Sequence, residues 1–380
     1  MINIFYWSPH LSNVATITNV VNSAYSLQKY NKKLFKVKIL DVAGEWIDQK
    51  KRLFDKEIGY LKIGTLNISS SLPVQGFLKS RLISIYIFLR SFLPLLKLLQ
   101  KQKPDYIIIH LLTSLPLFLL VLFKFDTKFI LRISGLPKLT FIRKFFWKMV
   151  SNKIHMVTCP SQETLDFLIK SKIFNCDKLI VLYDPIINVS EIRTKINLKS
   201  DLSNLKKNYF LSIGRLTKQK NHELLIDAFF LLDKNNDNYL YIIGEGEEKN
   251  KLLKKIKSLN LEKKIFLLGF KENVYPYISA SIGILSPSLW EDPGAVMIES
   301  AFCNKAIISS NCRNGPKEFL LNGEAGYLFE NNNEMSLKNN IEKMLHEDKK
   351  EIYSKIIKAK VNSKNYTIFN HYKILKSTLN

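Results

Sequence analysis

Short apolar runs alternate with longer mixed segments along the whole chain. In the first half, the runs predicted to be strands are Ile2 to Trp7, Phe35 to Val42, Tyr106 to Ile109, Phe129 to Ile133, Ile154 to Thr158 and Leu179 to Tyr183. A second series follows at Tyr209 to Ile213, Tyr239 to Ile243, Ile265 to Leu268, Ile282 to Leu285 and Ala306 to Ser309. Short apolar strands separated by helices are typical of parallel sheets built from crossover units. We therefore predict an α/β protein with two doubly wound domains.

The polar stretch between the two series sets the domain boundaries. It runs from about Ile187 to Asn208 and contains no predicted strand. We predict an N-terminal domain over residues 1–190, a linker over 191–207 and a C-terminal domain over 208–362, with a helix over 363–380 that returns to the N-terminal domain. Ligands of such sheets bind beyond the carboxyl ends of the strands, so two facing domains place a substrate in the cleft between them.

The stretch from Ser286 to Ser300 combines two acids with the start of a helix. A buried strand ends near Leu285, and Pro293-Gly294 predicts a helix start, so Glu291 lies just before the helix and Glu299 inside it. Free N–H groups at that helix end favour an anion such as a diphosphate. The two carboxylates would instead accept hydrogen bonds from hydroxyls of a sugar or ribose. The alternative is that both are ordinary surface acids near a helix start.

Two basic residues follow the first strand of the second series. Arg215 and Lys220 lie within Ser212 to Asn221, where a guanidinium and a mobile ammonium can hold a diphosphate and neutralise its growing charge. The alternative is that they are simply two of 57 basic residues. Gly244-Glu245-Gly246 follows the next strand, but Lys249 replaces the third glycine of a dinucleotide fingerprint, which disfavours a nicotinamide enzyme. No Asp-x-Asp cluster accompanies a strand end, so we expect no metal.

Three segments occur in the order typical of one enzyme family. The Glu291-x7-Glu299 pair, the segment from Ser212 to Asn221 and the segment from Asn314 to Phe329 resemble signatures of glycosyltransferase family four, a retaining family with the GT-B fold. The resemblance is specific over roughly residues 205 to 335. It implies that Glu299 binds the ribose, Glu291 the donor sugar, and Arg215 and Lys220 the diphosphate. The Gly294-Ala295 amides would complete the cradle, and Gly214 and Gly244 are further predicted donor-binding residues.

Composition points to an anionic partner. Lysine and arginine number 57 against 33 acids, a net charge of +24, which suits nucleic acid or an anionic membrane. Residues 79–103 and 138–153 mix cations with aliphatic and aromatic residues, as membrane-interface segments do; the alternative is helices packed on the sheet. The charge-free run from Tyr106 to Phe123 is long enough to span a membrane, but Pro116 and Thr113-Ser114 divide it into a strand and a short helix.

The remaining features concern the compartment and the first half. Cys159, Cys176, Cys303 and Cys312 show no zinc or disulfide spacing, and the start at Met1 lacks a basic signal region, so we expect a cytoplasmic protein. The loop from Ser8 to Ala15 lacks the glycine pair of many family members, and Ser134 stands where some relatives have a histidine. Whether His10 or His110 takes part in catalysis stays open.

The sequence thus predicts a membrane-associated glycosyltransferase on the inner face of the cell membrane. It would move a sugar from a UDP- or GDP-linked donor to a lipid-linked glycan in cell-surface polysaccharide synthesis, without a bound cofactor and without nucleic acid as a partner. The family resemblance implies retention at the anomeric carbon. A nucleotide-sugar epimerase of the same fold is one alternative. A basic nucleic-acid-binding protein is the other, although no known motif supports it.

Overall fold

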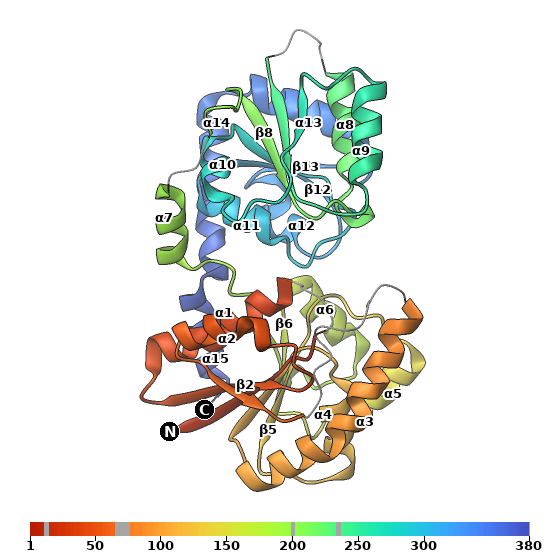
Figure 1. Cartoon of the computed structure of the whole chain (residues 1–380), viewed down its shortest axis with the longest axis vertical. Coiled ribbons are helices and arrows are strands. Elements are labelled where there is room, and N and C mark those ends of the chain that lie inside the picture. Colours follow the sequence, from red (N-terminus) through yellow and green to blue (C-terminus); the bar gives the residue numbers. More distant parts are fainter. Residues whose placement is uncertain (11–14, 65–76, 199–201, 233–236, 380) are drawn as a thin grey trace. The chain divides into compact units, whose positions relative to one another are not determined.

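The chain forms two units, each an open parallel sheet covered by helices (Figure 1). The computed structural model describes residues 1–10, 15–64, 77–198, 202–232 and 237–379. Unit 1 comprises Met1–Pro185 with Ile368–Asn380, and unit 2 comprises Ile186–Thr367. The C-terminal helix, α15 (Ile368–Ser377), therefore belongs to the first unit.

The sheet of unit 1 has seven parallel strands in the order β3-β2-β1-β4-β5-β6-β7. They are β1 (Ile2–Trp7), β2 (Phe35–Asp41), β3 (Gly59–Lys62), β4 (Tyr106–Ile109), β5 (Lys128–Arg132), β6 (Met156–Cys159) and β7 (Leu179–Val181). Successive β1 residues point to opposite faces: Ile4 and Tyr6 pack with α1 (Ala15–Asn31) and α15, whereas Phe5 and Trp7 join the core of the other face. That other face is covered by α3 (Phe77–Gln102), α4 (Ser114–Leu122), α5 (Phe141–Val150) and α6 (Gln162–Ser171).

The sheet of unit 2 has six parallel strands in the order β10-β9-β8-β11-β12-β13. They are β8 (Tyr209–Ile213), β9 (Tyr239–Ile243), β10 (Ile265–Leu267), β11 (Gly283–Ser286), β12 (Ala306–Ser310) and β13 (Tyr327–Phe329). One face carries α8 (His222–Leu231), α9 (Lys249–Ser258) and α13 (Glu334–His346), whose apolar residues share a core with the strands. The other helices are α7 (Val189–Asn197), α10 (Tyr275–Ala280), α11 (Ala295–Phe302), α12 (Pro316–Phe319) and α14 (Lys349–Ser363).

Two predictions about boundaries need correction. Residues 191–207 were expected to be a linker, but α7 begins before them and lies in unit 2, where Ile192 is buried and Asn273 donates to the carbonyl of Lys195. The edge strands β3 and β13, of four and three residues, were not predicted, because neither belongs to an apolar run longer than the strand itself. A short additional helix, α2 (Lys50–Asp55), precedes β3.

The two long apolar segments behave differently. The run from Tyr106 to Phe123 is divided as predicted, into β4 and α4. Within the described residues, one helical stretch, Arg81–Gln102 of α3, has the length and apolar character needed to cross a membrane, although 28% of its most apolar window is buried in the protein. One stripe of α3, including Ile87, Leu95 and Leu99, is part of the core of unit 1.

Candidate active site in unit 2

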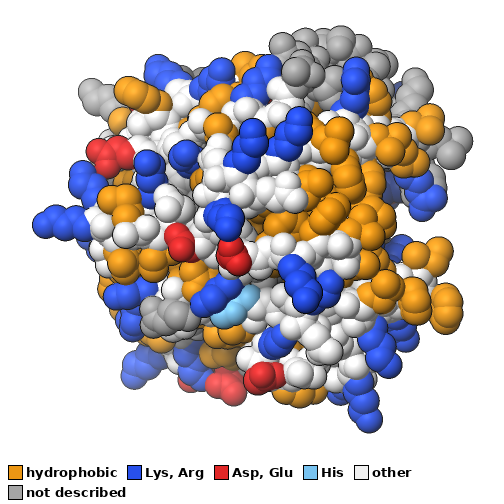
Figure 2. All heavy atoms as spheres, turned by 90° about the horizontal axis from the view of Figure 1, so that it is seen from below, with side chains coloured by type: hydrophobic (Ala, Val, Ile, Leu, Met, Phe, Trp, Pro, Cys, Tyr) orange, Lys and Arg blue, Asp and Glu red, His pale blue; other side chains and the backbone are white. Residues whose placement is uncertain are grey.

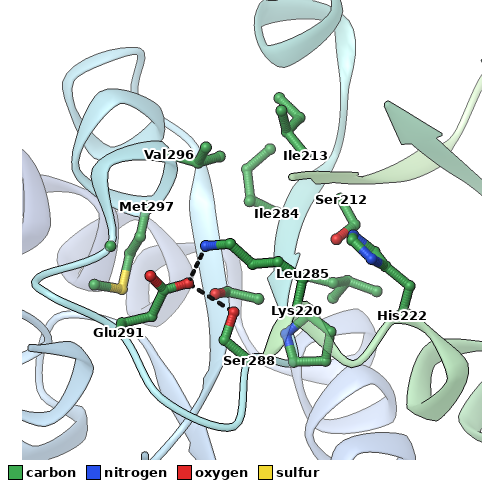
Figure 3. A pocket seen from close by; sticks show the side chains of 13 residues that line it. Ser212, Ile213, Lys220, His222, Ile284, Leu285, Ser288, Glu291, Val296 and Met297 are labelled. Atoms are coloured by element: carbon green, nitrogen blue, oxygen red, sulfur yellow. Dashed lines mark hydrogen bonds and ion pairs between the residues drawn. The ribbon is translucent and has the colours of Figure 1, made fainter. Parts of the chain in front are cut away.

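A cavity lies at the carboxyl ends of β8 and β11, against the first turn of α11 (Figure 3). Lys220 reaches across it, and its Nζ lies 2.5 Å from Oε1 of Glu291. The Ser288 hydroxyl donates to the same oxygen at 2.6 Å. Glu291 is buried, whereas the Lys220 side chain keeps 23% of its surface exposed. The carboxylate is therefore fixed from two sides, while the ammonium that neutralises it sits on a flexible stem.

Glycines let the backbone and Lys220 come close together. A Cβ on Gly214 would lie 3.3 Å from Cγ and Cδ of Lys220, so the missing side chain leaves room for the lysine stem. Gly244 lies against the carbonyl of Gly214, and its N–H donates to Gly269. Gly294 adopts φ +96° directly before α11, a conformation that favours glycine. Gly214 thus leaves room for the Lys220 stem, and Gly294 allows the turn before α11.

Glu299 lies in α11 but does not line this cavity. Its Oε1 accepts a hydrogen bond of 2.8 Å from the hydroxyl of Tyr275. Burial raises the pKa of Glu299 to about 7, although the Tyr275 hydrogen bond and the nearby Lys195 work in the opposite direction. This carboxyl therefore changes charge near neutral pH.

The structure brings some of the predicted site residues together and leaves others apart. Lys220, Glu291 and Gly294 line one cavity, and Gly214 lies beside the Lys220 stem. Arg215 follows β8 as expected, but its side chain is exposed and does not line the cavity. Ala295 and Gly244 also lie outside the lining. Arg215, Lys220 and Glu291 follow neighbouring strand ends as predicted. Only the Lys220 and Glu291 side chains line the cavity, whereas that of Arg215 is exposed.

The sequence interpretation missed two lining residues. His222 is 2% exposed, and burial, together with the nearby Lys220, lowers its pKa to about 3, so the ring is neutral at physiological pH. Its Nδ1 is buried and has no hydrogen-bond partner among the described residues. Ser288 was noted only as a neighbour of the acids, yet it fixes Glu291. Their positions beside Lys220 and Glu291 in the chain were the available signal.

The histidines of unit 1 occupy different surroundings. His10 packs edge-on against Trp46, with ring centres 4.9 Å apart, and Nδ1 lies 3.4 Å from the carbonyl of Ser8. Of the loop from Ser8 to Ala15, residues 11–14 lie outside the described residues. His110 is buried after β4 and stacks on Tyr6. Neither histidine lines the cavity of unit 2.

One known protein family matches most of unit 2. Residues 194–362 match the family described as glycosyl transferases group 1. The matched residues lie within unit 2. The family resemblance of the motif region is thereby confirmed at this level, and neither the epimerase nor the nucleic-acid alternative is favoured.

Several proteins that this chain resembles in sequence are named as glycosyltransferases. It is 34% identical over 239 residues to the N-acetylgalactosamine-N,N'-diacetylbacillosaminyl-diphospho-undecaprenol 4-alpha-N-acetylgalactosaminyltransferase of Campylobacter jejuni, covering 63% of this chain and 62% of that protein. It is 26% identical over 307 residues to the UDP-Gal:alpha-D-GlcNAc-diphosphoundecaprenol alpha-1,3-galactosyltransferase of Escherichia coli, covering 74% and 76%. The alignment thus spans less than two thirds of the Campylobacter protein.

Solved structures support the fold over the whole chain. A glycosyltransferase from Rickettsia africae superposes with a TM-score of 0.76 at 19% identity, covering 99% of this chain and 97% of that one. Anabaena Alr3699/HepE in complex with UDP and glucose gives 0.70 at 15% identity, covering 100% and 99%. The predicted α/β fold, with two doubly wound units of the GT-B type, is confirmed.

Proposed function

We propose that this glycosyltransferase moves a sugar from a nucleotide diphosphate-sugar to a lipid-linked glycan, with retention of the anomeric configuration, in cell-surface polysaccharide synthesis. The observation that carries the proposal is the Lys220–Glu291 pair in a cavity beside the N-terminus of α11. The Campylobacter and Escherichia coli relatives are named for diphospho-undecaprenol-linked glycans, and the latter for a UDP-sugar. These names support a lipid-linked acceptor and a UDP-linked donor, with a GDP-linked donor as the alternative.

In the proposed mechanism, Lys220 exchanges its partner Glu291 for the donor diphosphate. A donor diphosphate entering the cavity competes with Glu291 for Lys220, since a doubly charged diphosphate attracts the ammonium more strongly than one carboxylate does. Lys220 and Arg215 then neutralise the charge that grows on the diphosphate as the sugar leaves. Glu291 then loses its contact with Lys220 but keeps the hydrogen bond from Ser288, and it accepts a hydrogen bond from a hydroxyl of the donor sugar. The N–H groups at Gly294 and Ala295 complete the phosphate cradle.

Glu299 would bind the ribose of the donor, and transfer would need no metal ion. With Oε1 engaged by Tyr275, Oε2 would accept the ribose hydroxyls. Among the residues that the structure describes, no group of three or more His, Cys, Asp or Glu side chains is arranged to hold a metal ion. We therefore expect EDTA to leave sugar transfer unchanged, because Lys220 and Arg215 provide the positive charge; loss of activity that Mg²⁺ restores would contradict this.

Donor binding and transfer test the proposal separately. A thermal-shift screen against UDP, GDP, ADP and CMP should show stabilisation by one nucleotide class, since a ligand of the folded state raises the melting temperature according to its affinity. Transfer of radiolabelled sugar should then require a lipid-linked acceptor. Conversion of the nucleotide-sugar without any acceptor would favour the epimerase instead.

We also propose that unit 1 docks on an anionic bilayer. Figure 2 shows hydrophobic side chains gathered on one side of the lower face, with lysine and arginine side chains around them. The exposed apolar residues of α3 and α5 include Leu89 (67% exposed) and Phe141 (84%), and further members are Leu82, Ile85, Leu93, Ile142 and Phe145. Exposed cations on the same helices include Arg90, Lys97 and Lys148. Each cation near such a surface contributes about 1 kcal/mol, and the apolar groups insert.

Vesicle flotation tests this docking. Phosphatidylglycerol vesicles should float the protein, neutral vesicles should float less of it, and high salt should release only part, because inserted apolar groups resist screening. The variant Phe141→Asp/Phe145→Asp should lose flotation, whereas Phe270→Asp, at an equally exposed phenylalanine of unit 2, should not. Equal flotation of the two variants would remove α5 from the docking surface.

A further inference from the structure

The carboxyl of Glu299 has one hydrogen-bond donor among the described residues, the hydroxyl of Tyr275. The two oxygen atoms are 2.8 Å apart, and the tyrosine is the first residue of α10. Tyr275 is 8% exposed. Burial, together with the charge of Glu299, raises the pKa of Tyr275, so the phenol keeps its proton at physiological pH. Tyr275 therefore occupies Oε1 of Glu299 and leaves Oε2 for another donor.

Helix α7 places two charges beside this pair. The Lys195 Nζ lies 5.9 Å from the ring centre of Tyr275 and 2.8 Å from Oε1 of Glu191. Asn273, two residues before α10, donates to the Lys195 carbonyl at 2.8 Å and so ties α7 to α10. The positive charge of Lys195 lowers the pKa of Glu299, and the negative charge of Glu191 raises it. A helix in the segment that was expected to be a linker thus acts on the charge of Glu299.

The other elements around α11 leave this control to α7 and α10. Cys303 follows the last turn of α11, and burial, with Glu299 nearby, raises its pKa to about 12, so the thiol is neutral. Helix α14 brings Lys360 and the start of β12 brings Lys305, and both charges act on Cys303. Strand β11, which also packs on α11, carries no ionisable side chain.

The Tyr275 hydrogen bond affects both the charge and the direction of the Glu299 carboxyl. A donor stabilises a carboxylate more than a protonated carboxyl, because hydrogen bonds to ionised acceptors are roughly twice as strong as neutral ones. Without this donor, burial would keep Glu299 protonated to a higher pH. The carboxyl would also be free to rotate. A protonated or rotated carboxyl is a weaker acceptor for the hydroxyls of a ribose.

We propose that Tyr275 is a positioning residue of the donor site, which together with Lys195 of α7 holds Glu299 as an oriented carboxylate with Oε2 directed to the ribose. The inference rests on the proposed function, because it takes Glu299 to bind the ribose. Tyr275 acts through Glu299 and takes no part in the transfer of the sugar. Lys195 acts through its charge, and Glu191 sets how much of that charge reaches Glu299.

Infrared titration of the full chain tests the charge of Glu299 without any nucleotide. The carbonyl band of a protonated carboxyl that wild type shows and Glu299→Gln lacks reports this group. In wild type the band should disappear with a midpoint at about pH 7. In Tyr275→Phe the midpoint should rise by about one pH unit, as expected for the loss of one hydrogen bond to a charged acceptor. Lys195→Met should raise the midpoint by less, and Glu191→Gln should lower it.

The matched control is Tyr209→Phe. It also removes the hydroxyl of a buried tyrosine of unit 2, but this hydroxyl donates to the carbonyl of Tyr277 at 2.7 Å and not to an acid. Both variants lose one buried hydrogen bond, so their melting temperatures should fall to a similar extent. Tyr209→Phe should keep the wild-type midpoint. Equal midpoints in Tyr275→Phe and Tyr209→Phe would reduce Tyr275 to a structural residue and would overturn the proposal.

Calorimetric binding of UDP and 2′-deoxy-UDP tests the contact with the ribose. The ratio of the two affinities isolates one ribose hydroxyl, because both probes carry the same diphosphate and the titration of that group cancels. In wild type UDP should bind about tenfold more tightly than 2′-deoxy-UDP at pH 8, as expected for one hydrogen bond to a carboxylate, and the ratio should fall towards pH 6. In Tyr275→Phe the ratio at pH 8 should be at least about twofold smaller. Tyr209→Phe should follow wild type.

The two measurements separate this inference from the proposed function. If wild type binds neither UDP nor the corresponding guanosine nucleotide, the proposed function fails, and the assignment of Glu299 to the ribose fails with it. The infrared titration still decides whether Tyr275 and Lys195 control the charge of Glu299. If wild type binds UDP but Tyr275→Phe leaves the affinity ratio unchanged at every pH, the donor site stands and the positioning role of Tyr275 is overturned.

Discussion

Each unit pairs a cation with a carboxylate near the carboxyl end of its sheet, but the two pairs are built differently. In unit 1, Arg132 at the end of β5 is 3% exposed and donates both to Asp184 and to the carbonyl of Leu182. In unit 2, the Lys220 ammonium contacts Glu291 at 2.5 Å and its side chain is 23% exposed. The buried Arg132 guanidinium, which donates to two acceptors, stabilises the fold. The partly exposed Lys220 ammonium can exchange Glu291 for a ligand.

Burial of the cation distinguishes a pair that stabilises the fold from a pair that binds a ligand. Removing one member of a fully buried pair leaves the other charge buried and uncompensated, and this lowers the free energy of unfolding. Removing a cation that reaches solvent costs less stability, although the loss of charge at a ligand site costs activity. The two pairs should therefore respond oppositely to substitution, and the predictions below use that difference.

The largest effect is expected at the Arg132–Asp184 pair. Arg132→Met or Asp184→Asn should lower the free energy of unfolding by about 3–5 kcal/mol, as for other broken buried pairs. Lys220→Met should lower it by less, about 1–3 kcal/mol, because Glu291 is buried but keeps its hydrogen bond from Ser288. Urea unfolding followed by circular dichroism measures both. A matched double variant, Arg132→Met with Asp184→Leu, should regain part of the loss; equal destabilisation by Arg132→Met and Lys220→Met would contradict the distinction.

The second prediction compares a buried histidine in each unit. Burial lowers the pKa of both His222 and His371 to about 3, and His371 also bonds Ser23 and the Tyr183 carbonyl. Because the unfolded chain binds these protons near pH 6.5, stability is full above that pH and falls as the pH drops towards 3. The loss for each is roughly 3 kcal/mol by pH 4.

Stability measured from pH 7 to pH 4 checks this expectation. His371→Gln should reduce the pH dependence of the unfolding free energy of unit 1. His222→Gln should do the same for unit 2. Part of the dependence in unit 1 should remain in His371→Gln, because the pKa of His110 is also lowered. Unchanged pH profiles in both variants would show that neither ring stays neutral in the folded protein.

The third prediction concerns the turnover number of variants at Lys220 and Arg215. Lys220→Met and Arg215→Ala should each lower kcat about 100-fold while changing donor affinity less than about fivefold, because their charge matters most when the leaving diphosphate gains charge. Single-turnover kinetics with calorimetric donor binding separate the two quantities. Lys218→Ala, an exposed lysine between them in the chain, serves as the control. A loss confined to affinity would remove the catalytic role.

The smallest effect is expected at Glu299. Glu299→Gln should weaken donor binding by about 2 kcal/mol, since a charged acceptor for ribose hydroxyls becomes a neutral one. Because the pKa of Glu299 is raised to about 7, donor affinity of the wild type should rise with pH between 6 and 8, as the carboxylate form becomes populated. The glutamine variant should show a flat profile over that range. A pH dependence that persists in the variant would place the titrating group elsewhere.

Much of the fold was predictable because the strands carry their own signal. Buried parallel strands read as short apolar runs, so β1, β4, β8 and β9 were predicted to the residue. The edge strands β7 and β10 were predicted because their apolar runs continue to Tyr183 and Leu268, whereas β3 and β13 were missed because their runs are no longer than the strands. Helix α7 was missed because its residues are mostly polar, and only Ile192 is buried in it.

The sequence by itself determined the two sheets, the division of Tyr106 to Phe123 and the presence of Lys220, Glu291 and Gly294 at one sheet edge, because strand ends and helix starts are local properties. Tertiary structure alone decided that Lys220 pairs with Glu291, 71 residues away, that Glu299 turns to Tyr275 and that Arg215 is exposed. It also decided that His110 and Arg143 share a cavity. Side-chain direction and burial depend on neighbours that are distant in the chain, and these set the charge state of each site.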